Sequence, residues 1–295
     1  MDVDTFIITT FCLIDDVLQR GIPSAFLPQR GPAASLCPSE VLTMVAVGEF
    51  LGLDQDVALY RFFRTHYQPF FPALATLHRT SFVRQAANLW SLTHWVWQRL
   101  ADHSWHNDRA AIVDSFPLPV CRFARAYRCR RFAGEVAFGK DQVARQTFLG
   151  FRVHVRLVWP GIVRQVVVVP ANEGETAQVP LLAGGTSGTL LGDRNYHAPL
   201  LTEELLDQGV TLLAPYRFAS RDPSPAWSAH LSRLRYRIDT VFGQLVERFH
   251  IKRIWAHDTW HAWSRLLRKF LSHTIGVIIA TSTTGRPLQL QAVLD

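Results

Sequence analysis

Cysteine is scarce in this chain of 295 residues, which holds only Cys12, Cys37, Cys121 and Cys129. No two of them form a C-x-x-C pair, and no nearby histidine completes the spacing of a zinc site. The sequence therefore lacks the usual cysteine-based zinc and redox motifs. We expect four reduced thiols with neither a disulfide nor a metal partner.

Lysine is rarer still, with Lys140, Lys252 and Lys269 as its only examples, so arginine supplies almost all of the positive charge. Lys and Arg together number 31 against 24 Asp and Glu, which gives a formal net charge of +7. Because a guanidinium group binds phosphate oxygens in pairs, a basic, arginine-rich chain suits a polyphosphate partner such as nucleic acid. Charge alone does not exclude a basic protein without such a partner.

Long apolar runs and a basic leader are also missing. The longest apolar run near the C-terminus, residues 275–280, is too short to span a bilayer. Two of the first four residues are aspartates, unlike the basic start of a signal peptide. We therefore expect a soluble, cytoplasmic protein with no membrane partner.

Hydrophobic periodicity predicts an α/β protein with an all-helical N-terminal region. Residues 1–105 show helical spacing, and this region is either a DNA-binding module or a helical cap. In residues 106–280 the pattern predicts the order β-β-β-α-β-α-β, followed by a long helix over 228–250. That order describes a mixed five-stranded sheet flanked by helices. Residues 281–295 are predicted to be a polar C-terminal tail.

Two aspartates each follow a short apolar run that is typical of a buried strand. Asp114 ends the run over residues 110–113, and the run over residues 189–191 stops at Gly192 and Asp193. A carboxylate at the end of a buried strand needs a metal ion, a cationic side chain or donor N–H groups. If the two strands are neighbours, the carboxylates lie side by side and suit Mg²⁺ or Mn²⁺.

A pair of metal ions usually needs a third carboxylate, and the long predicted helix offers two. Asp239 borders the apolar stripe of that helix, whereas Glu247 lies two turns further on and points about 80° away. Asp239 is therefore the stronger candidate. Arg235, four residues earlier, offers the alternative that Asp239 forms an ordinary helical ion pair.

Residues 116–146 are predicted to form a long irregular segment in which arginines are interleaved with aromatic residues. Such a surface suits contact with nucleic acid, and a solvated basic hairpin is the alternative. The candidate DNA contacts in this segment are Arg122, Arg125, Arg128, Arg130, Arg131 and Lys140. Further candidates for phosphate contact are Arg194, Arg235, Arg237, Arg248, Lys252 and Arg253.

Three segments carry a resemblance to a known family: IVDS over 112–115, GDRNY over 192–196 and RYRIDTVFGQL over 235–245. The last is the most specific, and the likeness extends to SEVL over 39–42 and VGEFL over 47–51. Together they resemble bacterial insertion-sequence transposases of the DDE superfamily. The chain is most similar to the branch called insertion sequence family nine-eight-two.

The resemblance implies an RNase H-like catalytic domain that binds the terminal inverted repeats of a mobile element. It implies cleavage of the element's ends and joining of the 3′-hydroxyls to target DNA, with two Mg²⁺ or Mn²⁺ ions. By this resemblance Asp114, Asp193 and Asp239 are the catalytic, metal-binding triad. A homodimer is expected in the DNA complex, where the protein would be associated with the bacterial nucleoid. The superfamily's third acid is often glutamate, so the shorter Asp239 must lie closer or act through a water molecule.

Three other functions stay open. A metal-dependent nuclease on the same core would cut DNA without joining it. A catalytically decayed regulator would bind the element's ends and cleave nothing. A histidine-based hydrolase is weaker, because His197 lies near Asp193 with no serine or cysteine in a nucleophile elbow.

Overall fold

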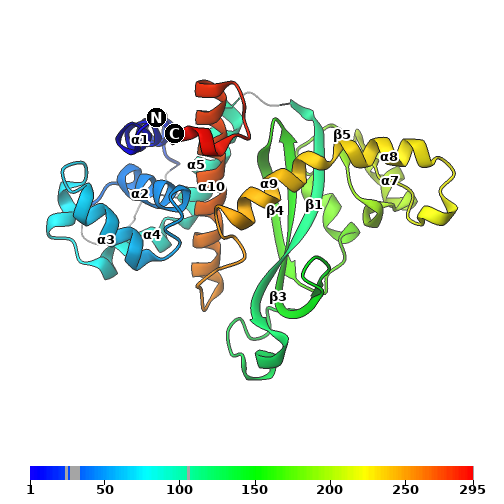
Figure 1. Cartoon of the computed structure of the whole chain (residues 1–295), viewed down its shortest axis with the longest axis horizontal. Helices are drawn as coiled ribbons and strands as arrows, with labels where there is room; N and C mark the ends of the chain where they lie inside the picture. Colours follow the sequence, from blue (N-terminus) through cyan, green and yellow to red (C-terminus); the bar gives the residue numbers. More distant parts are fainter. Residues whose placement is uncertain (24–25, 27–33, 105–106, 295) are drawn as a thin grey trace. The chain divides into compact units, whose positions relative to one another are not determined.

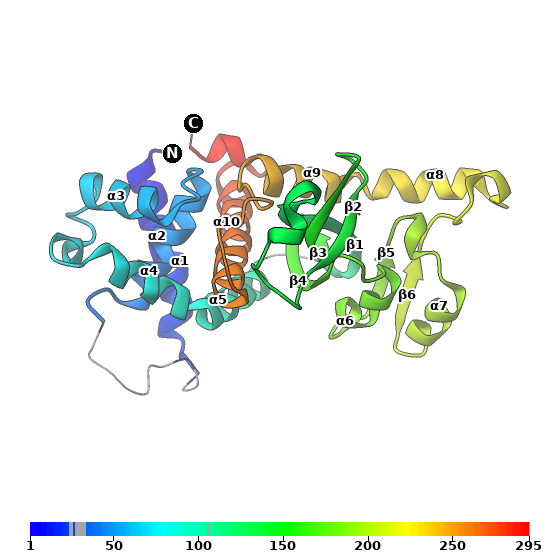
Figure 2. The same cartoon turned by 90° about the horizontal axis from the view of Figure 1, so that it is seen from below.

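A computed structural model describes residues 1–23, 26, 34–104 and 107–294, which form two compact units (Figure 1, Figure 2). Unit 1 combines Met1–Ser104 with Leu245–Asp295, and unit 2 comprises Trp105–Gln244. The predicted boundary between residues 105 and 106 lies outside the described residues. No helix in the described part of the chain is long and apolar enough to cross a membrane.

Unit 1 is built on two central helices, α2 (Pro38–Phe50) and α10 (Thr259–Thr284). Nearly every residue of α2 is buried, which matches its apolar composition on all sides. Helix α10 packs against both α2 and α5 (Trp90–His103). The remaining elements are α1 (Val3–Gln19), α3 (Asp56–His66), η2 (Pro72–Ala75), α4 (Arg79–Asn88) and η7 (Leu290–Val293).

The segments predicted from the sequence do not coincide with the compact units. Helix α10 was expected within the region 106–280, yet it belongs to unit 1 because it packs on α2 and α5. The predicted polar tail, residues 281–295, begins inside α10. Within that tail the side chains of Leu290 and Val293 are buried, and the amino group of Met1 donates a 3.0 Å hydrogen bond to the Val293 carbonyl. The end of the described chain is therefore part of the packed core of unit 1.

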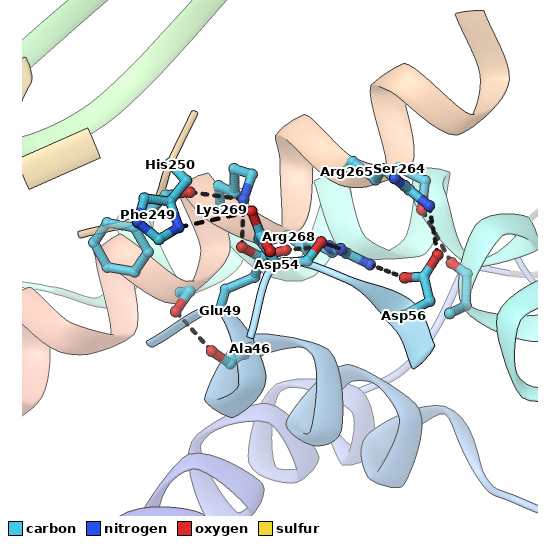
Figure 3. Close-up of polar contacts among 12 residues, drawn as sticks. Ala46, Glu49, Asp54, Asp56, Phe249, His250, Ser264, Arg265, Arg268 and Lys269 are labelled. Carbon is cyan, nitrogen blue, oxygen red and sulfur yellow. Dashed lines mark hydrogen bonds and ion pairs between the residues drawn. The ribbon is translucent and has the colours of Figure 1, made fainter. Parts of the chain in front are cut away.

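A network of buried charges joins α10 to α2 and α3 (Figure 3). The Glu49 carboxylate, which is 1% exposed, accepts hydrogen bonds from Arg268 Nε and, at 2.5 Å, from Lys269 Nζ. Arg268 Nη1 also donates to Asp56 Oδ1 at 2.6 Å, and Arg265 Nη2 donates to Asp56 Oδ2 at 2.6 Å. Each buried carboxylate is thus matched by cations from α10, as burial requires.

Unit 2 contains one mixed sheet of six strands, with the order β2-β3-β1-β5-β6 and with β4 also paired to β3. Strands β1, β5 and β6 are parallel neighbours, while β3 runs antiparallel to β1, β2 and β4. The bounds are β1 (Asn107–Arg122), β2 (Ala137–Asp141), β3 (Gln146–Trp159), β4 (Ile162–Pro170), β5 (Gly188–Leu191) and β6 (Val210–Leu213).

The mixed α/β prediction is confirmed, but the sheet has one strand more than the five expected. The extra strand is β2, which lies in the segment 116–146 that was predicted to be irregular. Strand β1 also runs on to Arg122, because its pairing with β3 continues through the polar and proline-containing stretch beyond Asp114. Outside the strands the segment leaves residues 123–136, which include η3 (Phe123–Arg128), and the turn over 142–145.

The long helix predicted over 228–250 is two helices, α8 (Pro225–Leu234) and α9 (Tyr236–Glu247), separated at Arg235. The side chain of Arg235 leaves the helical surface to pair with Asp114, a contact that the periodicity of the apolar residues does not reveal. The other helical elements of unit 2 are η4 (Thr176–Gln178), α6 (Val179–Ala183), η5 (Arg194–Tyr196), α7 (Pro199–Leu206) and η6 (Ala219–Arg221).

Candidate active site

The site is built on two neighbouring parallel strands, β1 and β5. Their register pairs Ile112 with Leu191, and β5 ends there. Asp114 and Asp193 each lie two residues further on, so they stand on the same side of the sheet at corresponding positions. The predicted neighbouring strands are therefore confirmed, although Asp114 lies within β1 rather than at its end.

The row below this pair is entirely apolar. Because side chains directly opposite each other share one face, four residues from four strands form that row. A pocket of about 400 Å³ lies over them and is also lined by residues of α8, including Trp227 and Leu231. The row consists of Leu157, Ile112, Leu191 and Leu213.

These surroundings change the acidity of both aspartates. Burial raises the pKa of Asp114 to about 6, although the Arg235 guanidinium acts in the opposite direction. Burial also raises the pKa of Asp193, while the backbone N–H of Asn195 lowers it. At Asp114 the negative charge of Asp193 raises the pKa further by repulsion. Two buried carboxylates side by side are stabilised in their charged form by a cation.

Arg235 supplies one such cation. Its Nη2 donates a 2.6 Å hydrogen bond to Asp114 Oδ2, and both side chains are only 16% exposed. The other carboxylate oxygen of Asp114 accepts the backbone N–H of Ser115 at 2.7 Å. The ion pair that the sequence offered between Arg235 and Asp239 is replaced by this longer-range pair with Asp114.

A third acid, Glu175, was not among the predicted site residues. Its Oε1 accepts a 2.7 Å hydrogen bond from Ser115 Oγ and a 3.0 Å hydrogen bond from Arg152 Nη1. After burial, which is the main cause, the charge of Glu175 is among the groups that raise the pKa of both Asp114 and Asp193. A glutamate in the polar stretch after a strand gives no signal in the sequence, so only the tertiary structure reveals it.

Tyr196 is buried near the three acids. Its side chain is 0% exposed, and its hydroxyl has no hydrogen-bond partner among the described residues. Burial raises the pKa of Tyr196 well above its usual range, and the carboxylates of Asp114, Glu175 and Asp193 add to the rise. Gly192 makes room for this ring, because a Cβ at Gly192 would lie 2.5 Å from Tyr196 Cβ.

The two candidates for the third acid of the triad are both exposed. Asp239 is exposed on α9, one turn after Arg235, and no described side chain forms an ion pair with it. Glu247 is exposed too and belongs to unit 1. The structure brings Asp114 and Asp193 together, and the identity of the third acid stays a prediction. Among the described residues, no three His, Cys, Asp or Glu side chains are arranged to hold a metal ion.

The predicted nucleic-acid segment forms an exposed tip of unit 2. Phe123 and Tyr127 of η3 are 61% and 77% exposed, and the Arg128 guanidinium lies 5.2 Å from the centre of the Tyr127 ring. Phe123 contacts Phe138 of β2 edge to face. Five of the six predicted basic contacts are exposed here: Arg122, Arg125, Arg128, Arg130 and Lys140.

The other predicted DNA contacts are mostly engaged within the protein. Arg131 and Arg194 donate to the carbonyls of Val120 and Tyr216, respectively. Arg237 stacks on Trp159 with 3.6 Å between the guanidinium carbon and the ring centre. Arg248 stacks in the same way on Phe50 at 4.1 Å, Lys252 is half-buried, and Arg253 is exposed.

A comparison with known protein families gives one match. A family model described as "Transposase DDE domain" matches residues 106–259, a little more than half of the chain. That stretch contains Asp114, Asp193, Asp239 and Glu175. A search of curated proteins finds no match, and neither does a search of solved structures.

Proposed function

Because the chain belongs to the family with a transposase DDE domain, we propose that it is a DNA transposase acting through Asp114 and Asp193. The reaction would be cleavage at the terminal inverted repeats of an insertion sequence, followed by joining of the 3′-hydroxyls to target DNA. The branch of the superfamily, insertion sequence family nine-eight-two, is part of this proposal. The observation that carries it is the register of β1 and β5, which sets two buried carboxylates at matching positions.

The carboxylate pair fits a divalent cation, which DDE transposases typically use. Asp114 and Asp193 would hold it, since hard carboxylate oxygens side by side are what Mg²⁺ and Mn²⁺ prefer. A bound ion of this kind lowers the pKa of a water or a hydroxyl and offsets charge on the phosphorus. The carboxylates would fix the position of the ion next to the apolar row that lies below them. We propose two ions, with Asp239 as the third ligand and Glu247 as its rival.

The exposed tip of unit 2 supports the DNA part of the proposal. Exposed arginines would contact phosphates, while Phe123 and Tyr127 offer rings on which unpaired bases stack. The remaining predicted phosphate contacts, including Arg194, Arg235 and Arg237, would need to exchange their present partners for DNA. Two ends must be cut together, so we propose a homodimer in the DNA complex.

The test is a cleavage and strand-transfer assay with duplexes carrying the terminal inverted repeats that flank the gene, in Mg²⁺ or Mn²⁺. Asp114→Asn and Asp193→Asn should lose both reactions, by at least about 1,000-fold, and keep DNA binding. The variants Asp239→Asn and Glu247→Gln identify the third acid. Only the variant that lacks the third metal ligand should lose cleavage and joining. Glu203→Gln, an exposed acid on α7, is the control and should stay active.

The assay also separates the alternatives. Cleavage without joining would identify a metal-dependent nuclease. End binding without cleavage by the unmodified protein in either metal would identify a decayed regulator and contradict the proposal. Full activity of Asp114→Asn and Asp193→Asn would show that the chemistry lies elsewhere.

A further inference from the structure

Residues 57–101 contain no aspartate and no glutamate, although the whole chain carries 24 acidic residues. This acid-free stretch runs from the second residue of α3 through η2 and α4 to most of α5. A surface without carboxylates attracts polyanions, because nothing weakens the positive potential of its cationic side chains. The stretch carries five arginines: Arg61, Arg64, Arg79, Arg84 and Arg99.

Helix α4 is held firmly within unit 1, beside α3 (Figure 1, Figure 2). Phe82 of α4 is 1% exposed, and its ring centre lies 6.0 Å from that of Tyr60 of α3. The Tyr60 hydroxyl donates a 2.6 Å hydrogen bond to the carbonyl of Leu77, shortly before α4 begins. Gln85 Nε2 donates to the Leu36 carbonyl at 2.7 Å. The exposed side chains of α4 are therefore carried on a well-packed support, as a binding surface requires.

A hollow of about 500 Å³ lies beside α4 within unit 1. Of the lining residues on α4, Val83 and Ala87 are largely covered, whereas Arg79, Arg84 and Asn88 are exposed. The first turns of α3 and α10 complete the lining. The polar side chains of α4 thus face solvent around an apolar part of the hollow.

The arginines of this hollow are not compensated by acids of the protein. No residue in the described part of the chain pairs with the guanidinium groups of Arg79 and Arg84. Asp56 is the only acid among the described lining residues, and it already accepts 2.6 Å hydrogen bonds from Arg265 and Arg268. The hollow therefore presents two guanidinium groups that are free to bind an anion.

Duplex DNA has both kinds of group that this surface can bind. Phosphate oxygens bind guanidinium groups in pairs, and adenine presents a donor and an acceptor that match the amide of an asparagine such as Asn88. An acidic protein would also suit the arginines. DNA is the better match because the chain has a formal net charge of +7 and belongs to a transposase family, whose members act on DNA.

We propose that unit 1 binds duplex DNA through α4, with Arg79 and Arg84 at phosphates and Asn88 at the edge of a base. The inference rests on the proposed function for the identity of the duplex, which is the end of the element. It gives unit 1 a DNA-binding surface of its own, in addition to the tip of unit 2. The helical N-terminal region is then a DNA-binding module and not only a cap.

The experiment measures binding of the full chain to a duplex of the element's end by fluorescence anisotropy, without divalent metal. Arg79→Ala together with Arg84→Ala should weaken binding at least about tenfold and lower the slope of log K against log salt by about 2. Arg20→Ala together with Arg286→Ala is the matched control, because it removes the same charge from exposed positions of unit 1 outside the acid-free stretch. This control should change affinity less than about twofold.

Asn88→Ala tests whether α4 reads sequence. It should reduce the preference for the end duplex over a scrambled duplex of equal length at least about fivefold, and leave the salt slope unchanged because the side chain is neutral. Gln68→Ala, at an exposed amide of the acid-free stretch outside the hollow, should keep the full preference. Circular dichroism and thermal melting check that each variant is folded.

Two results would overturn the inference. Equal binding by the two double variants would show that α4 is not the contact and would leave the hollow to another anion, such as an acidic protein. A full preference of Asn88→Ala for the end duplex would show that α4 reads no base.

These outcomes stay separate from those of the proposed function, because binding is measured without cleavage. A chain that binds the element's ends through α4 and joins no DNA would leave this inference intact and overturn the proposed function. Cleavage and joining that do not depend on Arg79 and Arg84 would do the reverse.

Discussion

Close packing determines which residues occupy the site as much as charge does. Asp193 follows Gly192, and the glycine is needed because Tyr196 packs against its α-carbon. The segment GDRNY over 192–196 therefore serves two purposes: it places a carboxylate two residues after the end of β5, and it leaves room for the buried ring of Tyr196. The sequence displays the motif but not the reason for its glycine.

Gly192→Ala should disturb this arrangement. The new Cβ would lie 2.5 Å from Tyr196 Cβ, so the ring or the turn must shift, at a cost of roughly 1–3 kcal/mol. Chemical denaturation measures the loss of stability. Gly243→Ala is the control, because nothing lies within 4 Å of that Cβ, and alanine in helix α9 should stabilise by about 1 kcal/mol. Equal stability of Gly192→Ala and the unmodified protein would contradict the packing argument.

The burial of His273 leads us to expect that the stability of the protein depends on pH. This histidine of α10 is fully buried beside Phe249, and burial lowers its pKa from 6.5 to about 4. Between those values the unfolded chain binds a proton that the folded chain does not, so the free energy of unfolding falls as the pH falls. The contribution of His273 to the free energy of unfolding is fully present above pH 6.5 and is lost by about pH 4. It amounts to something on the order of 3 kcal/mol.

Urea unfolding at several pH values between 4 and 7 tests this prediction. His273→Gln should make the free energy of unfolding less dependent on pH in that window, whatever its effect at pH 7. His66→Gln, at an exposed histidine of α3, should leave the pH dependence unchanged. An unchanged slope for His273→Gln would show that His273 does not titrate as proposed.

At the scale of elements, the charge network of unit 1 fixes how α10 lies against α2 and α3. Glu49 has two cationic partners on successive residues of α10, so a slide of either helix would leave a buried charge unpaired. Lys269 Nζ also donates to the Phe249 carbonyl at 2.6 Å, which ties the segment after α9 to the same helix (Figure 3). The segment VGEFL over 47–51 thus contributes to the stability of unit 1.

Glu49→Gln should destabilise unit 1 by about 3–5 kcal/mol, because it leaves Arg268 and Lys269 buried without their shared countercharge. Thermal or urea unfolding measures the change. Asp102→Asn is the comparison, since the Arg99–Asp102 pair is exposed and within one helix, so its loss should cost less than about 1 kcal/mol. A similar small cost for both variants would mean that the network contributes little.

At the scale of the whole molecule, exposed basic side chains are concentrated at the tip of unit 2. The chain carries a formal net charge of +7, and the tip of unit 2 presents five exposed basic side chains beside exposed aromatic rings. DNA binding by such a surface releases counterions and weakens with salt. Arginines that pair inside the protein, such as Arg235, add to the net charge and not to this surface.

Arg125→Ala and Arg128→Ala together should therefore weaken duplex binding and flatten its dependence on salt. Each lost phosphate contact should lower the slope of log K against log salt by about 1. Fluorescence anisotropy over a series of salt concentrations gives the slope. Arg221→Ala, at an exposed arginine outside the predicted contacts, should change neither quantity. An unaltered slope in the double variant would place the DNA contacts elsewhere.

The sequence by itself determined those features that local pattern controls. Alternation and helical spacing were enough for the mixed α/β class and the helical N-terminal region, and apolar runs ending in acids located Asp114 and Asp193. The extension of β1, the extra strand β2 and the break at Arg235 were not predicted, because cross-strand pairing and one distant ion pair outweigh local preference. Only the tertiary structure brought Glu175 into contact with Ser115 from 60 residues away and buried the Tyr196 hydroxyl near Asp114 and Glu175. Contacts between residues far apart in the chain depend on how strands pair and where one of them ends, and no local pattern records that.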